Sequence, residues 1–150
     1  MNENFDFSIR SLEQADVDQV YQIEQDLFSL PWTRKDFCDS IENENNIYLI
    51  IEKNGIIVGY CGLWGILEEG QINNIAIKRE YQNHKLGHHI LKELIKNGQK
   101  KGLKSFTLEV RESNKNAIHL YENLGFTSMG KRTGFYDYPK EDALIMWLYC

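Results

Sequence analysis

Cysteine is scarce in this sequence, and its spacing argues against the usual structural roles of cysteine. Only three occur among 150 residues, at Cys38, Cys61 and Cys150, and no two of them have the short spacing of a metal-binding pair. An odd number of cysteines without paired spacing is typical of free thiols in a reducing compartment. We therefore expect unpaired cysteines.

Long apolar stretches are also missing. No run approaches the roughly 20 apolar residues that span a bilayer, and residues 1–7 are polar and acidic rather than typical of a signal peptide. The sequence therefore predicts a cytoplasmic protein with no membrane partner.

Positive charge is in deficit. Lys and Arg number 17 against 22 Asp and Glu, which gives a net charge of -5. This balance argues against sequence-independent nucleic-acid binding and is compatible with attraction of a cationic peptide or amine. The length suits a single domain over residues 1–150, and we expect a monomer without a direct nucleic-acid partner.

The periodicity predicts alternating sheet and helix. The Asn54-Gly55 pair favours a hairpin, and a later strand–helix–strand crossover implies a parallel pair. Thr33, with Asp36 three residues on, resembles a capping box, and glycines at 59, 62 and 65 suggest bends or close backbone approach within one strand. We expect an α/β (mixed α+β) fold, with a mixed, mostly antiparallel sheet of about seven strands and about four helices covering both faces. The expected strands are 7–10, 47–52, 56–67, 71–77, 106–110, 126–131 and 143–149, with helices over 16–28, from residue 33, after residue 86 and over 113–124. A long connection over residues 133–142 is expected between the last two strands.

Residues 82–87 form a polar turn just ahead of an apolar helical stripe. A turn whose backbone N–H groups begin a helix is suited to binding phosphates. Lys78, Arg79, His84, Lys85 and His88 concentrate basic groups here. The alternative interpretation is a solvated charged turn.

Two acidic residues and one tyrosine are candidate site residues, each with a structural alternative. Glu24 lies beside an apolar helical stripe, so its carboxylate either reaches solvent at the rim or faces a substrate. Glu109 lies near the end of an apolar strand, where it either faces solvent or accepts a proton. Tyr121 lies on the inward stripe of a helix, where it is either a core residue or a proton donor.

Several separated segments carry a family resemblance. The turn resembles the Gln/Arg-x-x-Gly-x-Gly/Ala phosphate loop of the GNAT (GCN5-related N-acetyltransferase) family, although Lys85 stands where the first glycine belongs. The spacing from Ser113 through Tyr121 to residues 124–126 is similar to a signature of the family, and it is the most specific match in this sequence. Residues 27–33, followed by Phe37, resemble the RimI-type branch, the ribosomal-protein-alanine N-acetyltransferases.

This resemblance implies a cofactor, an acceptor and residue roles. Acetyl-CoA would be the co-substrate, with a sheet that splays at its site, and the acceptor would be the N-terminal alanine of ribosomal protein S18. Glu109 would be the general base and Tyr121 the general acid. Acetyl-CoA would contact Ile75, Ala76, Ile77, Asn83, His84, Lys85, Leu86, Gly87, His88 and Asn114, and the acceptor would lie beside Glu24, Trp32, Tyr136 and Tyr138.

Two other functions remain open at this stage. One is a GNAT enzyme with another acceptor, such as a lysine side chain, a small amine or other N-termini. The other is a non-catalytic acyl-CoA-binding or interaction module, suggested by the missing loop glycine. We expect no metal, because the adjacent His88 and His89 point to different helix faces and no carboxylate or cysteine completes a ligand set with His119.

Overall fold

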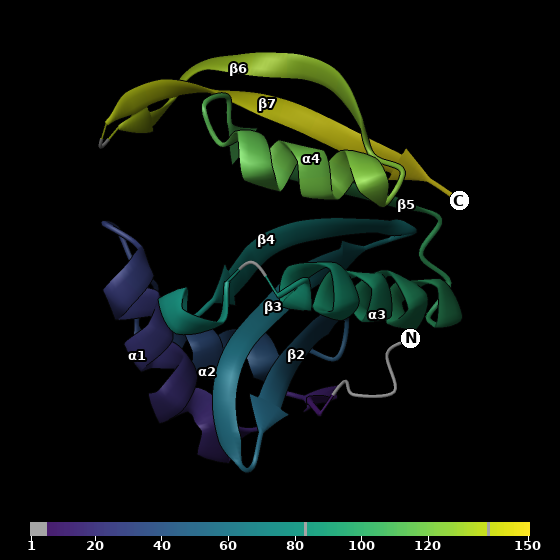
Figure 1. The fold of residues 1–150 in the computed structure, drawn as a ribbon. Helices are drawn as coiled ribbons and strands as arrows, with labels where there is room; N and C mark the ends of the chain where they lie inside the picture. Colours follow the sequence, from purple (N-terminus) through teal and green to yellow (C-terminus); the bar gives the residue numbers. More distant parts are fainter. Residues whose placement is uncertain (1–5, 83, 138) are drawn as a thin grey trace.

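The protein is described by a computed structural model that covers residues 6–82, 84–137 and 139–150. Within these residues, one seven-stranded sheet has the order β1-β2-β3-β4-β5-β7-β6 (Figure 1). The strands are β1 (Ser8–Ser11), β2 (Asn46–Lys53), β3 (Ile56–Ile66), β4 (Glu69–Ile77), β5 (Ser105–Arg111), β6 (Thr127–Asp137) and β7 (Lys140–Tyr149).

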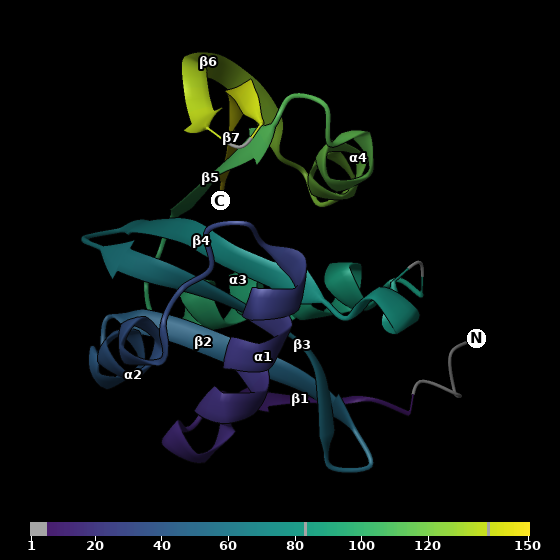
Figure 2. The same ribbon diagram turned by 90° about the vertical axis from the view of Figure 1, so that its left-hand side faces the viewer.

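Helices cover both faces of the sheet, as Figures 1 and 2 show. A short 3-10 turn, η1 (Gln14–Asp16), precedes the first α-helix of the chain, and another, η2 (Arg79–Tyr81), precedes the third. The predicted mixed α/β fold is therefore confirmed. The α-helices are α1 (Val17–Leu27), α2 (Arg34–Glu42), α3 (Leu86–Lys100) and α4 (Lys115–Asn123).

The sheet separates two apolar cores. Helices α3 and α4 bury their stripes against one face, and α1 and α2 bury theirs against the other. Within the described chain, no helix is both long enough and apolar enough to cross a membrane. Fully buried members of the first core include Ile51, Val58, Leu63, Ile90, Leu91, Leu94 and Phe106; those of the second include Val20, Phe37, Ile50, Ile57 and Tyr60.

The sheet opens between its fourth and fifth strands. All the other strand pairs are antiparallel, whereas β4 and β5 are parallel and share only three register pairs, the last being Gln71 with Thr107. Beyond Gln71, β4 stays paired with β3 while β5 stays paired with β7. Figure 2 shows the result, in which β5, β7, β6 and α4 group apart from the rest.

A β-bulge lies where this separation begins. Gly62 of β3 pairs with Asn74 and Leu63 pairs with Ile72, so Asn73 is the extra residue in β4. An extra residue re-aims the side chains on its strand and increases the local twist. The bulge therefore helps to turn β4 away from β5.

The glycines of β3 permit close packing, as the sequence suggested. A Cβ on Gly62 would lie 2.0 Å from the ring of Tyr48, a distance that no real Cβ contact shows. Tyr48 also forms hydrogen bonds through its hydroxyl with Oδ1 of Asn73 at 3.1 Å and of Asn74 at 3.3 Å. Gly62 thus makes room for the ring that supports the bulge.

The C-terminal hairpin corrects one expectation. A long connection was predicted over residues 133–142, but β6 runs to Asp137 and β7 begins at Lys140. Between the pairs Arg132–Ala143 and Tyr136–Glu141, three β6 residues face one β7 residue. Gly134, at φ +65°, donates its N–H to Asp142 Oδ1 at 2.8 Å. This bulge interrupts the strand alternation, which explains why the sequence resembles a loop.

Candidate active site

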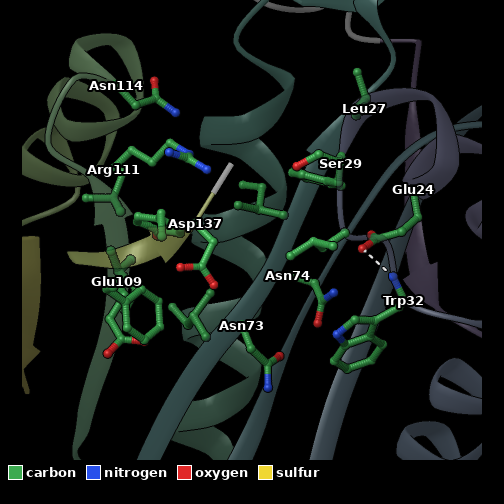
Figure 3. Close-up of a pocket in the computed structure, with 18 of the residues that line it drawn as sticks. Glu24, Leu27, Ser29, Trp32, Asn73, Asn74, Glu109, Arg111, Asn114 and Asp137 are labelled. Carbon is green, nitrogen blue, oxygen red and sulfur yellow. Dashed lines mark hydrogen bonds between the residues drawn. The ribbon is translucent and has the colours of Figure 1, made fainter. Parts of the chain in front are cut away.

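A cleft of about 630 Å³ lies where β4 and β5 separate. Figure 3 shows its two walls, with Glu24, Trp32 and Asn74 on one side and Glu109, Arg111 and Asn114 on the other. Its lining comes from α1 and the segment after it, from β4 and β5, from α4 with its N-cap, and from the end of β6. The lining residues are Glu24, Leu27, Phe28, Ser29, Leu30, Trp32, Ile72, Asn73, Asn74, Ile75, Leu108, Glu109, Val110, Arg111, Asn114, Tyr121, Phe135, Tyr136 and Asp137.

Glu24 contributes a buried carboxylate to the first wall. Its residue is 4% exposed, so the expectation of a solvent-facing carboxylate at the helix rim is wrong. One carboxylate oxygen accepts the hydroxyl of Tyr60, and the other accepts the Trp32 N–H at 3.0 Å. Burial raises the pKa of Glu24, and these two donors oppose that rise.

Trp32 is fixed on the same wall by its neighbours. Thr33 caps α2, because its hydroxyl accepts the Asp36 N–H at 3.1 Å while Asp36 accepts the Thr33 N–H at 2.9 Å. This reciprocal pair is the capping box that the sequence predicted. The indole then packs against Phe37, with ring centroids 5.2 Å apart, and against Trp64 at 6.2 Å.

Glu109 lies on the opposite wall because successive side chains of β5 point to opposite faces of the sheet. Leu108 and Val110 point into the core under α3 and α4, so Glu109 points to the other face of the sheet. Its side chain is 30% exposed and forms an ion pair with Arg132, whose Nε lies 2.8 Å from Oε2. Glu109 therefore remains accessible from the cleft.

Tyr121 reaches the same cleft from α4. It is 5% exposed and packs against Phe126, with ring centroids 6.0 Å apart. Burial raises the pKa of its phenol, so the group stays protonated and able to donate. Among the described residues its hydroxyl has no hydrogen-bond partner, and no polar side-chain atom is both sealed from solvent and unpaired.

Other lining residues are held by a network on the second wall. Asn114 caps α4 by accepting the Ala117 N–H at 3.2 Å. The Arg111 guanidinium lies 4.3 Å from the centre of the Tyr136 ring and pairs with Glu141 at 3.2 Å. Two predicted site residues, Asn114 and Tyr136, are thus ordered parts of the cleft.

The predicted phosphate loop leads directly into α3. Lys85 is the N-cap residue and has left-handed backbone angles, φ 63° and ψ 17°, in the conformation that favours glycine. The Gln82 amide donates to the Ile77 carbonyl at 2.9 Å, which ties the loop to β4. Lysine therefore occupies the first glycine position of the motif in a backbone conformation that glycine adopts readily.

The remaining predicted cofactor residues separate into backbone and side-chain candidates. Ile75 lines the cleft, whereas Ala76 is buried beneath α1 and α2, so only its backbone is available. Leu86 is also buried, and it begins α3 with Gly87 and His88. Asn83 and Tyr138 lie outside the described residues.

The histidines of α3 show no metal site. The rings of His88 and His89 are 6.2 Å apart and nearly perpendicular, and burial lowers the pKa of His89. Across the described ranges, no group of three His, Cys, Asp or Glu side chains is arranged to hold a metal ion.

Sequence reasoning missed several residues that shape the cleft. Tyr60 and Arg132 hold the two acidic residues, yet neither lies near its partner in the sequence. Asn73 and Asn74 were missed as well. Two adjacent asparagines within an apolar strand were a usable signal for the bulge, because asparagine is uncommon in strand interiors.

Comparison with known proteins identifies the class. Residues 17–126 match the Acetyltransferase (GNAT) family. A Bacillus subtilis (strain 168) protein, provisionally named a ribosomal protein bS18-alanine N-acetyltransferase, is 40% identical over 142 residues, covering 94% of each chain. The chain therefore belongs to the GNAT acetyltransferase family and is an enzyme of that class.

Solved structures agree with this assignment. The crystal structure of the ribosomal-protein-S18-alanine N-acetyltransferase from Escherichia coli has a TM-score of 0.88 and 36% identity, covering 95% of this chain and 93% of that one. The Arabidopsis thaliana NAA60 structure in complex with acetyl-CoA has a TM-score of 0.86 at 15% identity, covering 95% and 98%. The second likeness shows the shared fold alone.

Proposed function

We propose that this enzyme transfers the acetyl group of acetyl-CoA to a protein N-terminal α-amine, that of the N-terminal alanine of ribosomal protein S18. The observation that carries the proposal is the presence of Glu109 and Tyr121, from β5 and α4, in one cleft at the sheet opening. The names of relatives at 40% and 36% identity support the choice of acceptor.

The opening of the sheet fits acetyl-CoA. From Ile72 to Ile77, β4 has left its pairing with β5, so the backbone groups on that edge are available to the amides of an extended ligand arm. At the start of α3, the N–H groups of Leu86, Gly87 and His88 have no acceptor within the helix. Amides of this kind, together with the helix dipole, bind phosphate groups.

Two residues of the cleft, Glu109 and Tyr121, transfer the protons that the reaction requires. An α-amine has a pKa near ~8 and is largely protonated at neutral pH, so it must lose a proton before it can attack. Glu109 takes this proton, directly or through a water, and the free amine then bonds to the thioester carbonyl carbon. The nitrogen loses a second proton as the amide forms, which balances the proton that Tyr121 gives to the sulfur. Tyr121 donates a proton to the sulfur when the carbon–sulfur bond breaks. A β4 backbone N–H near Ile77 stabilises the developing negative charge on the carbonyl oxygen.

The acceptor enters between the two walls. Trp32 and Tyr136 both line the cleft, and Glu24 accepts the backbone N–H of Trp32. All of these groups belong to one chain, so we expect the monomer to be active. A ribosomal acceptor would place the reaction in the cytoplasm, where ribosomal proteins are made.

The experiment is acetyl-CoA turnover with a peptide that copies the S18 N-terminus. The matched control is the same peptide with its α-amine blocked and an internal lysine left free. Turnover that requires the free α-amine is the expected result. Turnover with the blocked peptide would indicate a lysine acceptor, and acetyl-CoA binding without turnover on either would indicate another amine. A protein that binds no acetyl-CoA would contradict the proposal as a whole.

A further inference from the structure

Arg132 forms an ion pair with Glu109, so its positive charge lies beside the carboxylate that we propose as the base. Arg132 Nε lies 2.8 Å from Glu109 Oε2, with the two side chains 58% and 30% exposed. The contact uses one carboxylate oxygen, Oε2, and within the described residues the other oxygen has no hydrogen-bond partner. The pair is therefore partly exposed to solvent, and the other carboxylate oxygen of Glu109 is available to a second hydrogen-bonding group.

The geometry of the hairpin sets this contact. Glu109 is opposite Ile145 of β7, and Ile145 is opposite Gly130 of β6. Arg132, two residues beyond Gly130 and on the same face, reaches diagonally across β7. It lies just before the β6 bulge, and its guanidinium is 5.5 Å from the centre of the Phe135 ring. Arg132 thus links the carboxylate to the segment that lines the cleft.

Arg132 supplies the charge that balances Glu109. Arg111, the arginine that lines the cleft, pairs with Glu141 and stacks on Tyr136. Glu24 and Asp137 also line the cleft and are acidic. Without Arg132, the exposed carboxylate of Glu109 would face an incoming cation with no partner of its own.

An unpaired carboxylate would favour the wrong form of the acceptor. The protonated amine has no lone pair and cannot attack a thioester, yet it is attracted to a bare carboxylate. Binding that stabilises this ground state more than the transition state lowers KM and slows the chemical step. A guanidinium on the same carboxylate weakens that attraction and leaves the second oxygen for the proton.

We propose that Arg132 neutralises Glu109 so that the cleft does not retain the acceptor as an unreactive ammonium ion. This role rests on the proposed N-acetyltransferase function and assigns Arg132 as a positioning residue for the base. In the Arg132→Gln variant, KM for the acceptor peptide and kcat should both fall. A solely structural residue would lower kcat without lowering KM.

Two unreactive peptides test the charge directly by binding titration. One carries a trimethylated N-terminus, which is permanently cationic, and the other carries an acetylated N-terminus, which is neutral. Arg132→Gln should bind the cationic peptide about 1.5- to 5-fold more tightly, the range expected for one exposed ion pair. Its affinity for the neutral peptide should not change.

Matched variants separate charge from packing. Arg132→Lys keeps the charge and should stay close to the wild type. Lys131→Gln is the neighbouring control, because Lys131 pairs with Glu112 outside the cleft lining. In a Glu109→Gln background, Arg132→Gln should no longer tighten binding of the cationic peptide, since the two residues act through one contact.

The outcomes distinguish this inference from the proposed function. Equal changes for the two peptides, or no change for the cationic one, would overturn the role of Arg132 even if the wild type acetylates the free peptide. If the wild type binds both peptides but acetylates no α-amine, the proposed function is wrong. The comparison of the cationic and neutral peptides would still test the role of Arg132. Binding of neither peptide by any variant would contradict both.

Discussion

Two glutamates on opposite walls of the cleft differ in their access to water. Glu24 is 4% exposed and is held by the Tyr60 hydroxyl and the Trp32 N–H. The Glu109 side chain is 30% exposed and forms an ion pair with Arg132. A buried carboxylate is costly unless its hydrogen bonds are made, whereas an accessible one exchanges partners readily.

We infer from this difference that Glu24 mainly stabilises the fold, whereas Glu109 takes part in the reaction. Glu24 joins α1 to β3 and to the segment before α2, so we expect changes there to affect stability first. Glu109 can meet an acceptor without disturbing the core, so we expect changes there to affect turnover first. Each of the following predictions tests one side of this contrast.

Glu109→Gln should have the largest effect. Loss of the base should lower kcat for the free-amine peptide by about 10²- to 10⁴-fold. The free energy of unfolding should change by less than about 1 kcal/mol, because the lost ion pair is partly exposed. Steady-state kinetics and urea denaturation measure the two quantities. Glu112→Gln is the control, and an unchanged rate across the pH range would remove Glu109 from the role of base.

Tyr60→Phe should act mainly on stability. It removes a hydroxyl that donates to the buried Glu24 carboxylate, and leaving such a group underbonded costs about 1–3 kcal/mol. Urea denaturation would show this loss. Tyr149→Phe is a matched control on a residue that is 63% exposed. A large fall in kcat with unchanged stability would mean that the Tyr60–Glu24 pair serves the chemistry instead.

Glu24 should contribute to the pH dependence of the free energy of unfolding, and we expect this effect to be smaller than that of Tyr60→Phe. Burial raises the pKa of Glu24 above the ordinary value near ~4.3, so between the two pKa values the folded state holds a proton that the unfolded state has lost. The stabilising contribution is present below the ordinary value and is lost as pH rises through the raised pKa. The opposite holds for Asp16, whose pKa is lowered by its hydrogen bonds with Arg10.

Unfolding free energies of the wild type and Glu24→Gln, measured side by side from about pH 4 to 8, isolate this term. The advantage of the wild type should shrink as pH rises. An advantage that grows with pH would mean that the folded protein stabilises the ionised form of Glu24.

Lys85→Gly should have the smallest effect and serves as a reference outside both walls. Lysine in the left-handed region is strained, and glycine relieves that strain at some cost in unfolded-state entropy. We expect a gain of about 0.5 kcal/mol in the free energy of unfolding. Thermal denaturation with and without acetyl-CoA would measure it, and a loss of stability would show that the lysine side chain supports the loop.

Local chemistry in the sequence was sufficient for much of the architecture. The capping box at Thr33, the Asn54-Gly55 turn and the glycines of β3 were predicted from short-range rules, and the structure confirms them. Such features depend on backbone conformations and hydrogen bonds within a few residues, which is why they can be inferred before the fold is known. The family motif around Asn114 and Tyr121 was specific enough to indicate the class.

Only the tertiary structure decided what surrounds each candidate residue. The sequence could not place Tyr60 against Glu24 or Arg132 against Glu109, because these partners are 36 and 23 positions apart and meet only when the strands pair. The β6 bulge likewise depends on Asp142 of the next strand accepting the Gly134 N–H. The sequence thus determined the class and the candidate residues, whereas long-range pairing determined which carboxylate is buried and which is open to an acceptor.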